Sequence, residues 1–175
     1  MRQPEPYEYP NSRYFAEYLN FEVEEVLIEL LKNQENQLRD VCQNLSKGQE
    51  NVAYSPGKWS LKQLIGHLID TERIFTYRAL AISRGERQAL PGYDEDAYQS
   101  HSQYESQDFD DILTQYHHVR QASISLIRSF SPNQANQLGN ANGHQVSVRA
   151  ICWMIAGHEK HHLSIINERY LPHFL

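Results

Sequence analysis

Apolar residues recur along this chain with the three- and four-residue spacing of amphipathic helices. The pattern occupies four long stretches, at about residues 20–48, 60–84, 108–131 and 147–170. No stretch of alternating apolar and polar residues competes with them as a strand pattern. The sequence therefore predicts an all-α protein whose four long helices form a four-helix bundle.

Capping residues mark the ends of these predicted helices. Ser60 is suited to cap the second helix, with Gln63 completing a capping box, and Ser147 is suited to cap the fourth. Gly48 closes the first helix, and the run 140–143 has the composition of a turn before the fourth. The helix boundaries are thus predicted from local chemistry as well as from periodicity.

Two segments lie outside the helical pattern. Residues 1–18 contain three prolines and four tyrosines, which predicts an extended N-terminal arm packed by its aromatic rings, followed by the bundle in residues 19–175. The polar segment 85–106 is long for a connection within a compact domain. It is interpreted either as a wall or lid of a functional site or as a solvated crossover loop between the second and third helices.

Composition narrows the class of protein. The 175 residues fit one domain, and a net charge of −6 without a block of Lys or Arg argues against a nucleic-acid partner. No window approaches eighteen apolar residues, so no membrane span is expected, and the first residues lack the apolar segment of a signal peptide. Cys42 and Cys152 fall within helical patterns and are expected to be small buried residues. A cytoplasmic protein is expected.

Two histidines in the fourth predicted helix carry the most informative chemistry. His158 and His162 are four residues apart, so on a helix they differ by only about 40° of rotation and aim at one point. Both fall inside the apolar arc of that helix, where a polar ring is unfavourable unless it is paired or ligated. His161 falls at the edge of the arc and is interpreted as a rim residue. His67, in the second helix, is the natural third ligand.

Simpler interpretations of these histidines remain open. Nine histidines make an i,i+4 pair easy to obtain by chance, and a histidine at the flank of a stripe, such as His67, is more often solvated than ligating. The run from His158 to His162 also spells the HExxH motif of zinc proteases. In such a protease Glu159 would face the metal, but the helical rotation places it about 100° from His158, away from that direction.

Further polar residues are candidates for the surroundings of the site. Glu72 lies near the middle of the apolar stripe of its helix, and a buried carboxylate requires a partner. It is interpreted either as a hydrogen-bond acceptor for a ligand histidine or, with a slight preference, as the partner of Arg73 or Arg78. The residues that could anchor a substrate or cofactor in a pocket are Arg78, Tyr77, Tyr93, Asp94 and His144.

An ordered set of short motifs then resembles a known family. Trp59-Ser60, the run 67–73, the run Leu90 to Asp94 and the run 157–162 resemble the DinB-like superfamily, including the YfiT-type proteins, over about residues 20–170. The resemblance implies a four-helix bundle, commonly a homodimer, with a three-histidine site for a divalent metal. Carried over by position, the metal ligands that the resemblance implies are His67, His158 and His162. The helical rotation of His158 and His162 into the apolar arc points to the same residues.

The resemblance leaves the reaction open. Some members of the superfamily join a low-molecular-weight thiol such as bacillithiol, mycothiol or glutathione to an electrophile, one branch isomerises maleylpyruvate, and others are described as metal-dependent hydrolases. The leading hypothesis is a thiol S-transferase acting on an electrophilic small molecule. The alternatives are a metal-dependent hydrolase and a non-catalytic metal-binding or stress-response module. Nickel and zinc rank first as the metal, and iron and manganese also fit histidine ligands.

Overall fold

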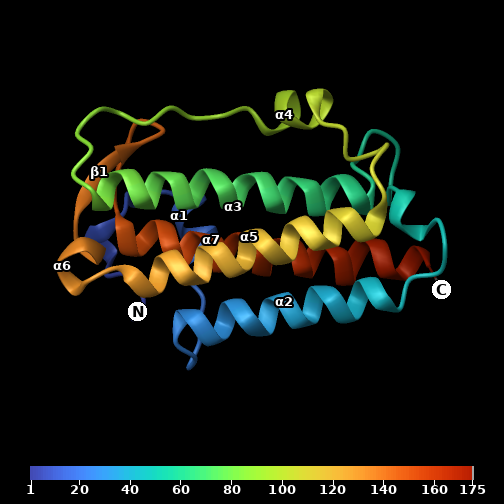
Figure 1. Ribbon diagram of the computed structural model, residues 1–175, viewed down its shortest axis with the longest axis horizontal. Helices are drawn as coiled ribbons and strands as arrows, with labels where there is room; N and C mark the ends of the chain where they lie inside the picture. The colour runs from blue at the N-terminus through green and yellow to red at the C-terminus, as the bar shows by residue number, and fades with distance from the viewer. Residues whose placement is uncertain (175) are drawn as a thin grey trace.

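A computed structural model describes residues 1–174 as a four-helix bundle with smaller elements at one end (Figure 1). The long helices are α2 (Leu27–Gln43), α3 (Leu61–Ser83), α5 (Phe109–Ser129) and α7 (Val148–Ile165). The predicted fold class is therefore confirmed. Across residues 1–174, no helix combines the length and the hydropathy that are needed to cross a bilayer.

The two predicted serine caps act as their positions in the sequence suggest, whereas α2 ends at Gln43 rather than at Gly48, which instead precedes the 3-10 turn Gln49–Asn51. The Ser60 hydroxyl accepts a hydrogen bond from the Gln63 backbone amide at 3.2 Å, and the Gln63 side chain accepts one from the Ser60 amide at 2.8 Å. The Ser147 hydroxyl accepts a hydrogen bond from the Ala150 amide at 2.9 Å at the start of α7. These bonds satisfy amides that have no partner within the helix, which sets where α3 and α7 begin.

The order of the helices around the bundle explains the long connection after α3. Helix α3 packs against α5 and α7, and α2 packs against the same two helices, so α2 and α3 lie diagonally opposite. The colours of Figure 1 show that α3 and α5 run in the same direction. The chain must therefore return along the length of α3, about 34 Å for its 23 residues, before α5 can begin.

That returning segment is more ordered than a solvated loop. It contains a short helix, α4 (Glu95–His101), which the sequence analysis did not predict. The Asp94 carboxylate accepts a hydrogen bond from the Ala97 amide at 3.0 Å and so caps this helix. Leu90 pairs through its backbone with Asn140 and Asn142, each at 2.9 Å, which holds the start of the segment against the following hairpin.

A β-hairpin precedes α7, although the sequence showed only its turn. Strands β1 (Leu138–Ala141) and β2 (His144–Ser147) pair antiparallel after the short helix α6 (Pro132–Ala135). Asn142 and Gly143 form the two-residue turn with φ values of 53° and 77°. Both residue types tolerate this left-handed backbone. The strands are four residues long, too short for an alternating pattern to stand out in the sequence.

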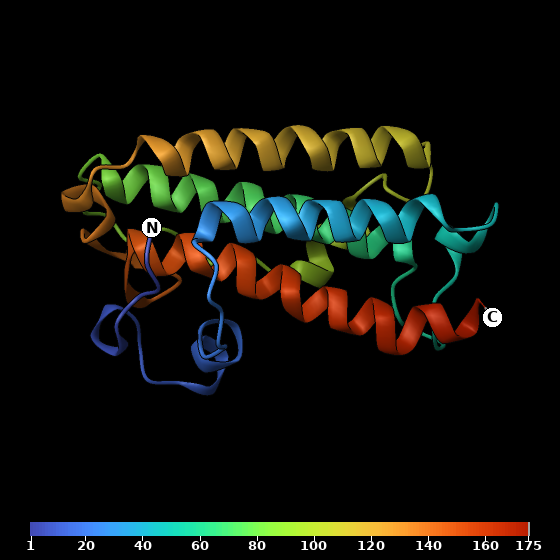
Figure 2. The same cartoon turned by 90° about the horizontal axis from the view of Figure 1, so that it is seen from below.

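The N-terminal arm is also less extended than predicted. Residues 13–19 form the helix α1 (Arg13–Leu19), after a 3-10 turn at Pro6–Glu8, and α2 begins at Leu27 rather than near residue 20. The reason is a short amphipathic pattern, because Phe15 and Leu19 are four residues apart and both are buried. Helix α1 packs against α7, and Figure 2 shows the arm gathered on that side of the bundle.

Smaller turns complete the chain. A 3-10 turn, Gln49–Asn51, lies between α2 and α3. Helix α7 continues into a π-helical turn, Ile166–Tyr170, and then a 3-10 turn, Leu171–His173. These turns lie at the end of the bundle opposite the hairpin (Figure 1).

The buried interior is divided by a polar layer. One apolar cluster includes Leu31, Phe75 and Ile124, and the other includes Leu38, Leu68 and Ile166. Between them, buried polar side chains project from all four long helices: Gln34, Glu35, His67, Thr71, Glu72, Arg120, His158, Glu159 and His162. A buried layer of this kind requires internal pairing, because each isolated polar group there would be unfavourable.

Gly157 lets α1 approach the helix that carries two of the histidines. A Cβ atom built at Gly157 would collide with the backbone carbonyl of Tyr18. Gly157→Ala is therefore expected to lower the free energy of unfolding by roughly 1–3 kcal/mol, the usual effect of overpacking. Helix propensity alone predicts the opposite sign, since Ala is favoured over Gly by about 1 kcal/mol within a helix.

Denaturant unfolding distinguishes these two outcomes. The exposed Ser164→Ala in the same helix serves as the control and is expected to change the free energy of unfolding by less than about 0.5 kcal/mol. A more stable Gly157→Ala protein would show that α1 does not pack closely at this point.

Candidate metal centre

Three histidines from two helices meet within the polar layer. The Nε2 atom of His158 lies 3.0 Å from that of His67 and 3.1 Å from that of His162. His67 comes from α3, and the other two come from successive turns of α7. Among residues 1–174, these three make up the group whose ligand atoms are close enough to share a metal ion.

The donor atoms fit a shared divalent ion better than they fit one another. Nitrogen ligands bonded at about 2.1 Å, with about 90–109° between them, lie about 3.0–3.4 Å apart. Without an ion, the Nε2 atom of His158 offers one hydrogen or one lone pair, and therefore cannot hydrogen-bond to both neighbours at once. At least one of the two contacts then lacks a well-aligned hydrogen bond, whereas a shared cation would be bound by all three lone pairs.

Burial keeps these imidazoles in the form that binds metals. His67, His158 and His162 are at most 9% exposed. Burial lowers the pKa of His67 to about 4. Burial also lowers the pKa of His162 to about 3, with a smaller contribution from His67 and His161. The pKa of His158 lies well below its ordinary value for the same first reason. All three rings are neutral near pH 7, so their lone pairs are available.

An arginine beside the histidines ties the four helices together. Arg120, in α5, donates to the Glu72 carboxylate of α3 at 2.7 Å and also to the Glu159 carboxylate of α7. Its remaining terminal nitrogen donates to the Leu31 carbonyl of α2 at 2.8 Å. Burial alone would lower the pKa of Arg120, but the facing carboxylates outweigh it and raise that pKa well above its ordinary value.

The ion pairs of Arg120 account for Glu72 and Glu159, the two acidic residues whose partners the sequence did not identify. Glu72 forms an ion pair, as was slightly preferred, but its partner is Arg120 rather than Arg73 or Arg78. Glu159 is 1% exposed and also accepts a hydrogen bond from the Tyr116 hydroxyl. Its two carboxylate oxygens are therefore occupied on the side away from the histidines, which does not match the HExxH arrangement of zinc proteases.

Aromatic rings enclose the three imidazoles. The ring centroid of Tyr18 lies 5.6 Å from that of His158, and the centroid of Trp59 lies 4.9 Å from that of His67. The Thr71 hydroxyl lies 3.5 Å from Nδ1 of His67 and 2.5 Å from the Tyr93 hydroxyl. The Trp59 and Tyr93 motifs of the sequence thus lie directly around the histidines.

Two pockets border the histidines. One has a volume of about 330 Å³ and is lined by residues that include Tyr14, Phe75, Arg78 and His158. The other has a volume of about 340 Å³ and includes Lys58, Trp59 and His162. Glu95, at the start of α4, lines both pockets. The pKa of the Glu95 carboxyl is raised, first by burial and then by the negative charges of Asp96 and Asp94.

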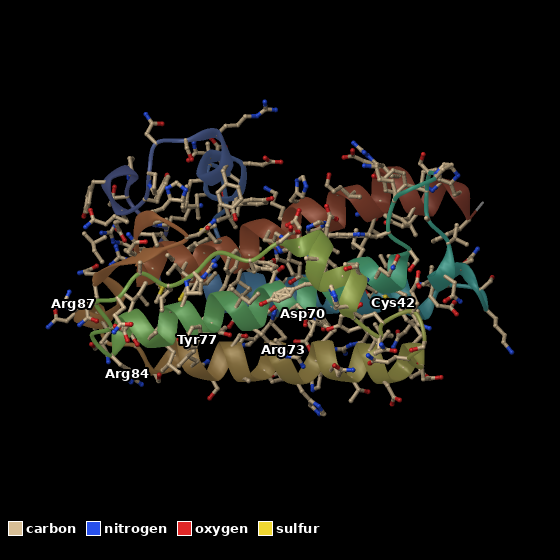
Figure 3. The ribbon with its side chains drawn as sticks, turned by 90° about the horizontal axis from the view of Figure 1, so that it is seen from above. Cys42, Asp70, Arg73, Tyr77, Arg84 and Arg87 are labelled. Atoms are coloured by element: carbon tan, nitrogen blue, oxygen red, sulfur yellow. The ribbon has the colours of Figure 1, made fainter. Side chains whose placement is uncertain are left out.

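The remaining predicted pocket residues are divided between the site and the surface. Arg78, Tyr93 and His144 line the pocket beside His158. Asp94 lines neither pocket and instead caps α4. Tyr77 is 58% exposed on the outside of α3, where it is labelled in Figure 3. His161 lies at the edge, with its Nδ1 atom 3.3 Å from the Glu17 carboxylate.

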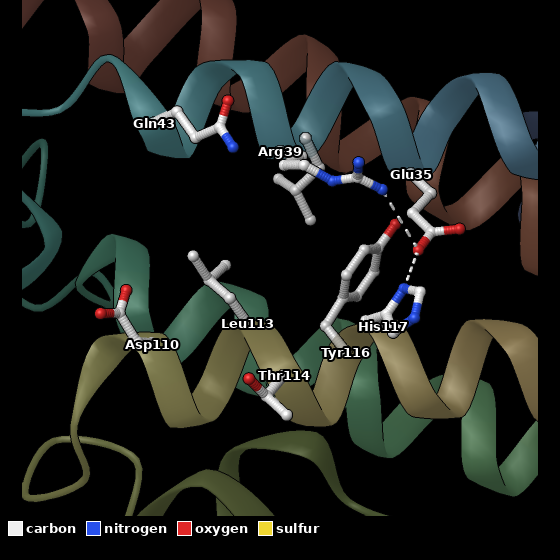
Figure 4. A pocket seen from close by; sticks show the side chains of 9 residues that line it. Glu35, Arg39, Gln43, Asp110, Leu113, Thr114, Tyr116 and His117 are labelled. Atoms are coloured by element: carbon white, nitrogen blue, oxygen red, sulfur yellow. Dashed lines mark hydrogen bonds and ion pairs between the residues drawn. The ribbon is translucent and has the colours of Figure 1, made fainter.

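A separate pocket of about 440 Å³ lies between α2 and α5 (Figure 4). It is lined by Leu38 and Leu113, and its polar edge is a hydrogen bond between Nδ1 of His117 and the Glu35 carboxylate at 2.5 Å. Tyr116 lines this pocket and donates its hydroxyl hydrogen to Glu159. None of the three converging histidines lines this pocket, so it is separate from the candidate metal centre.

Comparison with known proteins agrees with this geometry. The profile of the DinB superfamily matches residues 30–166, which include all three histidines. The chain belongs to the DinB superfamily. No curated protein is similar enough to this sequence to count as a relative. Membership in the DinB superfamily confirms the resemblance that the sequence motifs carried.

A solved structure with a similar four-helix bundle supports the fold of this chain. YfiT from Bacillus subtilis, described as a probable metal-dependent hydrolase with an unusual four-helix bundle topology, is 18% identical to this chain. Its TM-score is 0.76, and the match covers 95% of this chain and 97% of YfiT. The similarity therefore extends from the arm to the end of α7.

Arg120 and Glu95 were not among the site residues predicted from the sequence. Arg120 had a detectable signal, because it lies four residues from Tyr116 and from Ile124, inside the buried stripe of α5. Glu95 had no such signal, because its position depends on how the crossover folds back over the bundle.

Proposed function

We propose that this protein is a metal-dependent enzyme that joins a low-molecular-weight thiol to an electrophilic small molecule. His67, His158 and His162 hold the divalent ion, with nickel or zinc as the first choices. The observation that carries the proposal is the pair of pockets, one reaching His158 and the other His162. Two pockets that meet at one centre suit a reaction that brings two small molecules together.

The chemistry follows from the charge of the site. A divalent ion held by His67, His158 and His162 as neutral imidazoles would keep its full charge and would lower the pKa of a bound thiol or water. Glu95 is the protein group that accepts the thiol proton, because its carboxylate lines both pockets and its raised pKa makes it the stronger base. The sulfur lone pair forms the new S–C bond, and the leaving group departs with its bonding electrons.

Hydrolysis is the second candidate, and the same carboxylate favours it. Glu95 lines both pockets that border the histidines, where its carboxylate would take a proton from water, and YfiT is described as a probable metal-dependent hydrolase. In both reactions Glu159 has no direct role, since its oxygens bond Tyr116 and Arg120.

A comparison of two glutamine variants tests the proposal. Activity is measured with a panel of thiols and a chlorinated nitrobenzene, and separately with esters in the absence of thiol. Glu95→Gln is expected to lower S-transfer by about 100- to 10,000-fold, the range for removing a general base. Glu159→Gln, which preserves size, is expected to retain most activity once its folding has been verified by circular dichroism.

The outcomes separate the candidates. Product formation that requires both the metal and a thiol supports the transferase. Ester cleavage that requires the metal but no thiol, and that is lost in Glu95→Gln, would establish the hydrolase instead. Binding of metal without turnover in either assay would favour the non-catalytic module.

A further inference from the structure

Arg78 differs from the other buried arginines of this protein. Three arginines are buried among the described residues: Arg78, Arg120 and Arg149. Arg120 pairs with Glu72 and Glu159, and Arg149 pairs with Glu8 at 2.5 Å. No carboxylate within residues 1–174 lies within ion-pair distance of Arg78. A buried guanidinium without a counter-charge is rare, because buried charges are normally paired.

The hydrogen bonds of Arg78 leave most of its donors free for a ligand. Arg78 is 7% exposed and donates one hydrogen bond to a protein acceptor, from Nη2 to the Pro91 carbonyl at 2.7 Å. A guanidinium has five N–H donors in a planar fork that matches a carboxylate. The contact with Pro91 orients the fork, and the carbon of the guanidinium lies 6.0 Å from the centre of the Phe75 ring.

The groups facing Arg78 do not neutralise it. Burial raises the pKa of Tyr93 to about 12 and also raises that of Tyr14, so both phenols are protonated and uncharged near pH 7. Glu95 lines the same pocket but forms no ion pair with Arg78. Burial lowers the pKa of Arg78, but an arginine begins so high that it stays charged. The pocket therefore contains a fixed positive charge.

The wall next to this charge is built to keep its shape. Leu90 pairs through its backbone with the hairpin turn, and Asn142 of that turn lines the pocket. A Cβ atom at Gly92 would collide with the side-chain amide of Asn142, so a larger residue there would require the Asn142 side chain to shift. The short motif from Leu90 to Tyr93 thus seals one side of the pocket that holds Arg78 and His158.

We propose that the pocket beside His158 binds a small molecule through a carboxylate, held by the guanidinium of Arg78, while the rest of the molecule lies toward His158. This inference rests on the proposed function and specifies it: one of the two reactants carries a carboxylate. The volume of about 330 Å³ is that of a small organic acid rather than a polymer. Tyr14 and Phe75 supply an apolar wall for its carbon skeleton.

Binding of simple acids to the purified metal-containing protein tests the proposal without any turnover. Acetate, benzoate and phenylacetate are titrated by calorimetry, with benzamide and phenylacetamide as uncharged counterparts. At least one acid is expected to bind saturably and at least about tenfold more tightly than its amide. Arg78→Gln is expected to lower the affinity for that acid at least about tenfold, the loss expected when a charge-assisted pair of hydrogen bonds is removed.

Two further variants make the result specific. Arg73→Gln removes a charge from the outer side of the same helix (Figure 3) and is expected to bind the acids as the unmodified protein does. Arg78→Lys keeps the charge but loses the fork, so intermediate binding is expected, and it replaces Arg78→Gln if that variant does not fold. Metal content is measured for each protein, because a carboxylate bound only by the metal would persist in Arg78→Gln.

Several results would overturn the proposal. These are equal binding of acids and amides, unchanged acid binding in Arg78→Gln with its metal retained, or no saturable binding of any of the three acids. Failure here is distinct from failure of the proposed reaction, which is judged by metal retention and by turnover with a thiol. A protein can transfer thiols without an acid anchor, and it can bind acids without transferring thiols.

Discussion

Replacing His158 with alanine is expected to abolish stoichiometric metal binding and to weaken the remaining affinity by at least about 100-fold. His158 is the central member of the cluster, since its Nε2 atom lies 3.0 Å and 3.1 Å from those of His67 and His162. Without it, the two remaining nitrogens cannot complete a three-nitrogen site. Elemental analysis of protein purified without a histidine tag measures the content, and competition with a chelator measures the affinity.

His161 provides the matched control for this prediction. It is in the same helix and adjacent to His162, but its side chain is 34% exposed and its Nδ1 atom lies near the Glu17 carboxylate. His161→Ala is expected to keep its metal, whereas His67→Ala and His162→Ala are expected to lose it. A folded His161→Ala protein that lost its metal would refute the assignment of the three ligands.

Replacing Arg120 with methionine is expected to lower the free energy of unfolding by about 3–5 kcal/mol, as when one partner of a buried ion pair is removed. The substitution leaves Glu72 and Glu159, which are 4% and 1% exposed, facing each other without a cation. It also removes the donor to the Leu31 carbonyl and so loosens the link to α2. Denaturant unfolding at pH 7 measures the change.

Two comparisons show whether the unpaired charges are the cause. Arg128→Met, at an exposed position of the same helix, is expected to change stability by less than about 0.5 kcal/mol. Adding Glu72→Gln and Glu159→Gln to Arg120→Met is expected to restore part of the loss, because no buried carboxylate is then left unpaired. An effect of Arg120→Met below about 1 kcal/mol would mean that water reaches the cluster.

The arginine cluster and the histidine cluster are neighbours, and this has a mechanical consequence. Glu159 directly follows His158 in α7, and Glu72 lies five residues after His67 in α3. Arg120 joins these two carboxylates, so it sets the spacing of the two helices that carry the histidines. The effect of Arg120→Met on metal affinity is therefore expected to accompany its effect on stability.

Local patterns in the sequence determined the four long helices and part of the site. Apolar spacing located α2, α3, α5 and α7, and Ser60 and Ser147 marked where two of them begin, because periodicity and capping depend on residues close in the chain. The same local geometry placed His158 and His162 on one face of α7 and turned Glu159 away from them. The sequence also required a partner for Glu72 but could not identify it.

Tertiary structure alone decided which distant residues meet. His67 reaches the pair on α7 because α3 and α7 are packed neighbours, and Arg120 reaches Glu72 and Glu159 because its stripe faces the bundle centre. The parallel run of α3 and α5 forces the crossover back over the histidines, which brings Glu95 rather than Asp94 into both pockets. These tertiary contacts join residues far apart in the chain, so no local sequence pattern could encode them.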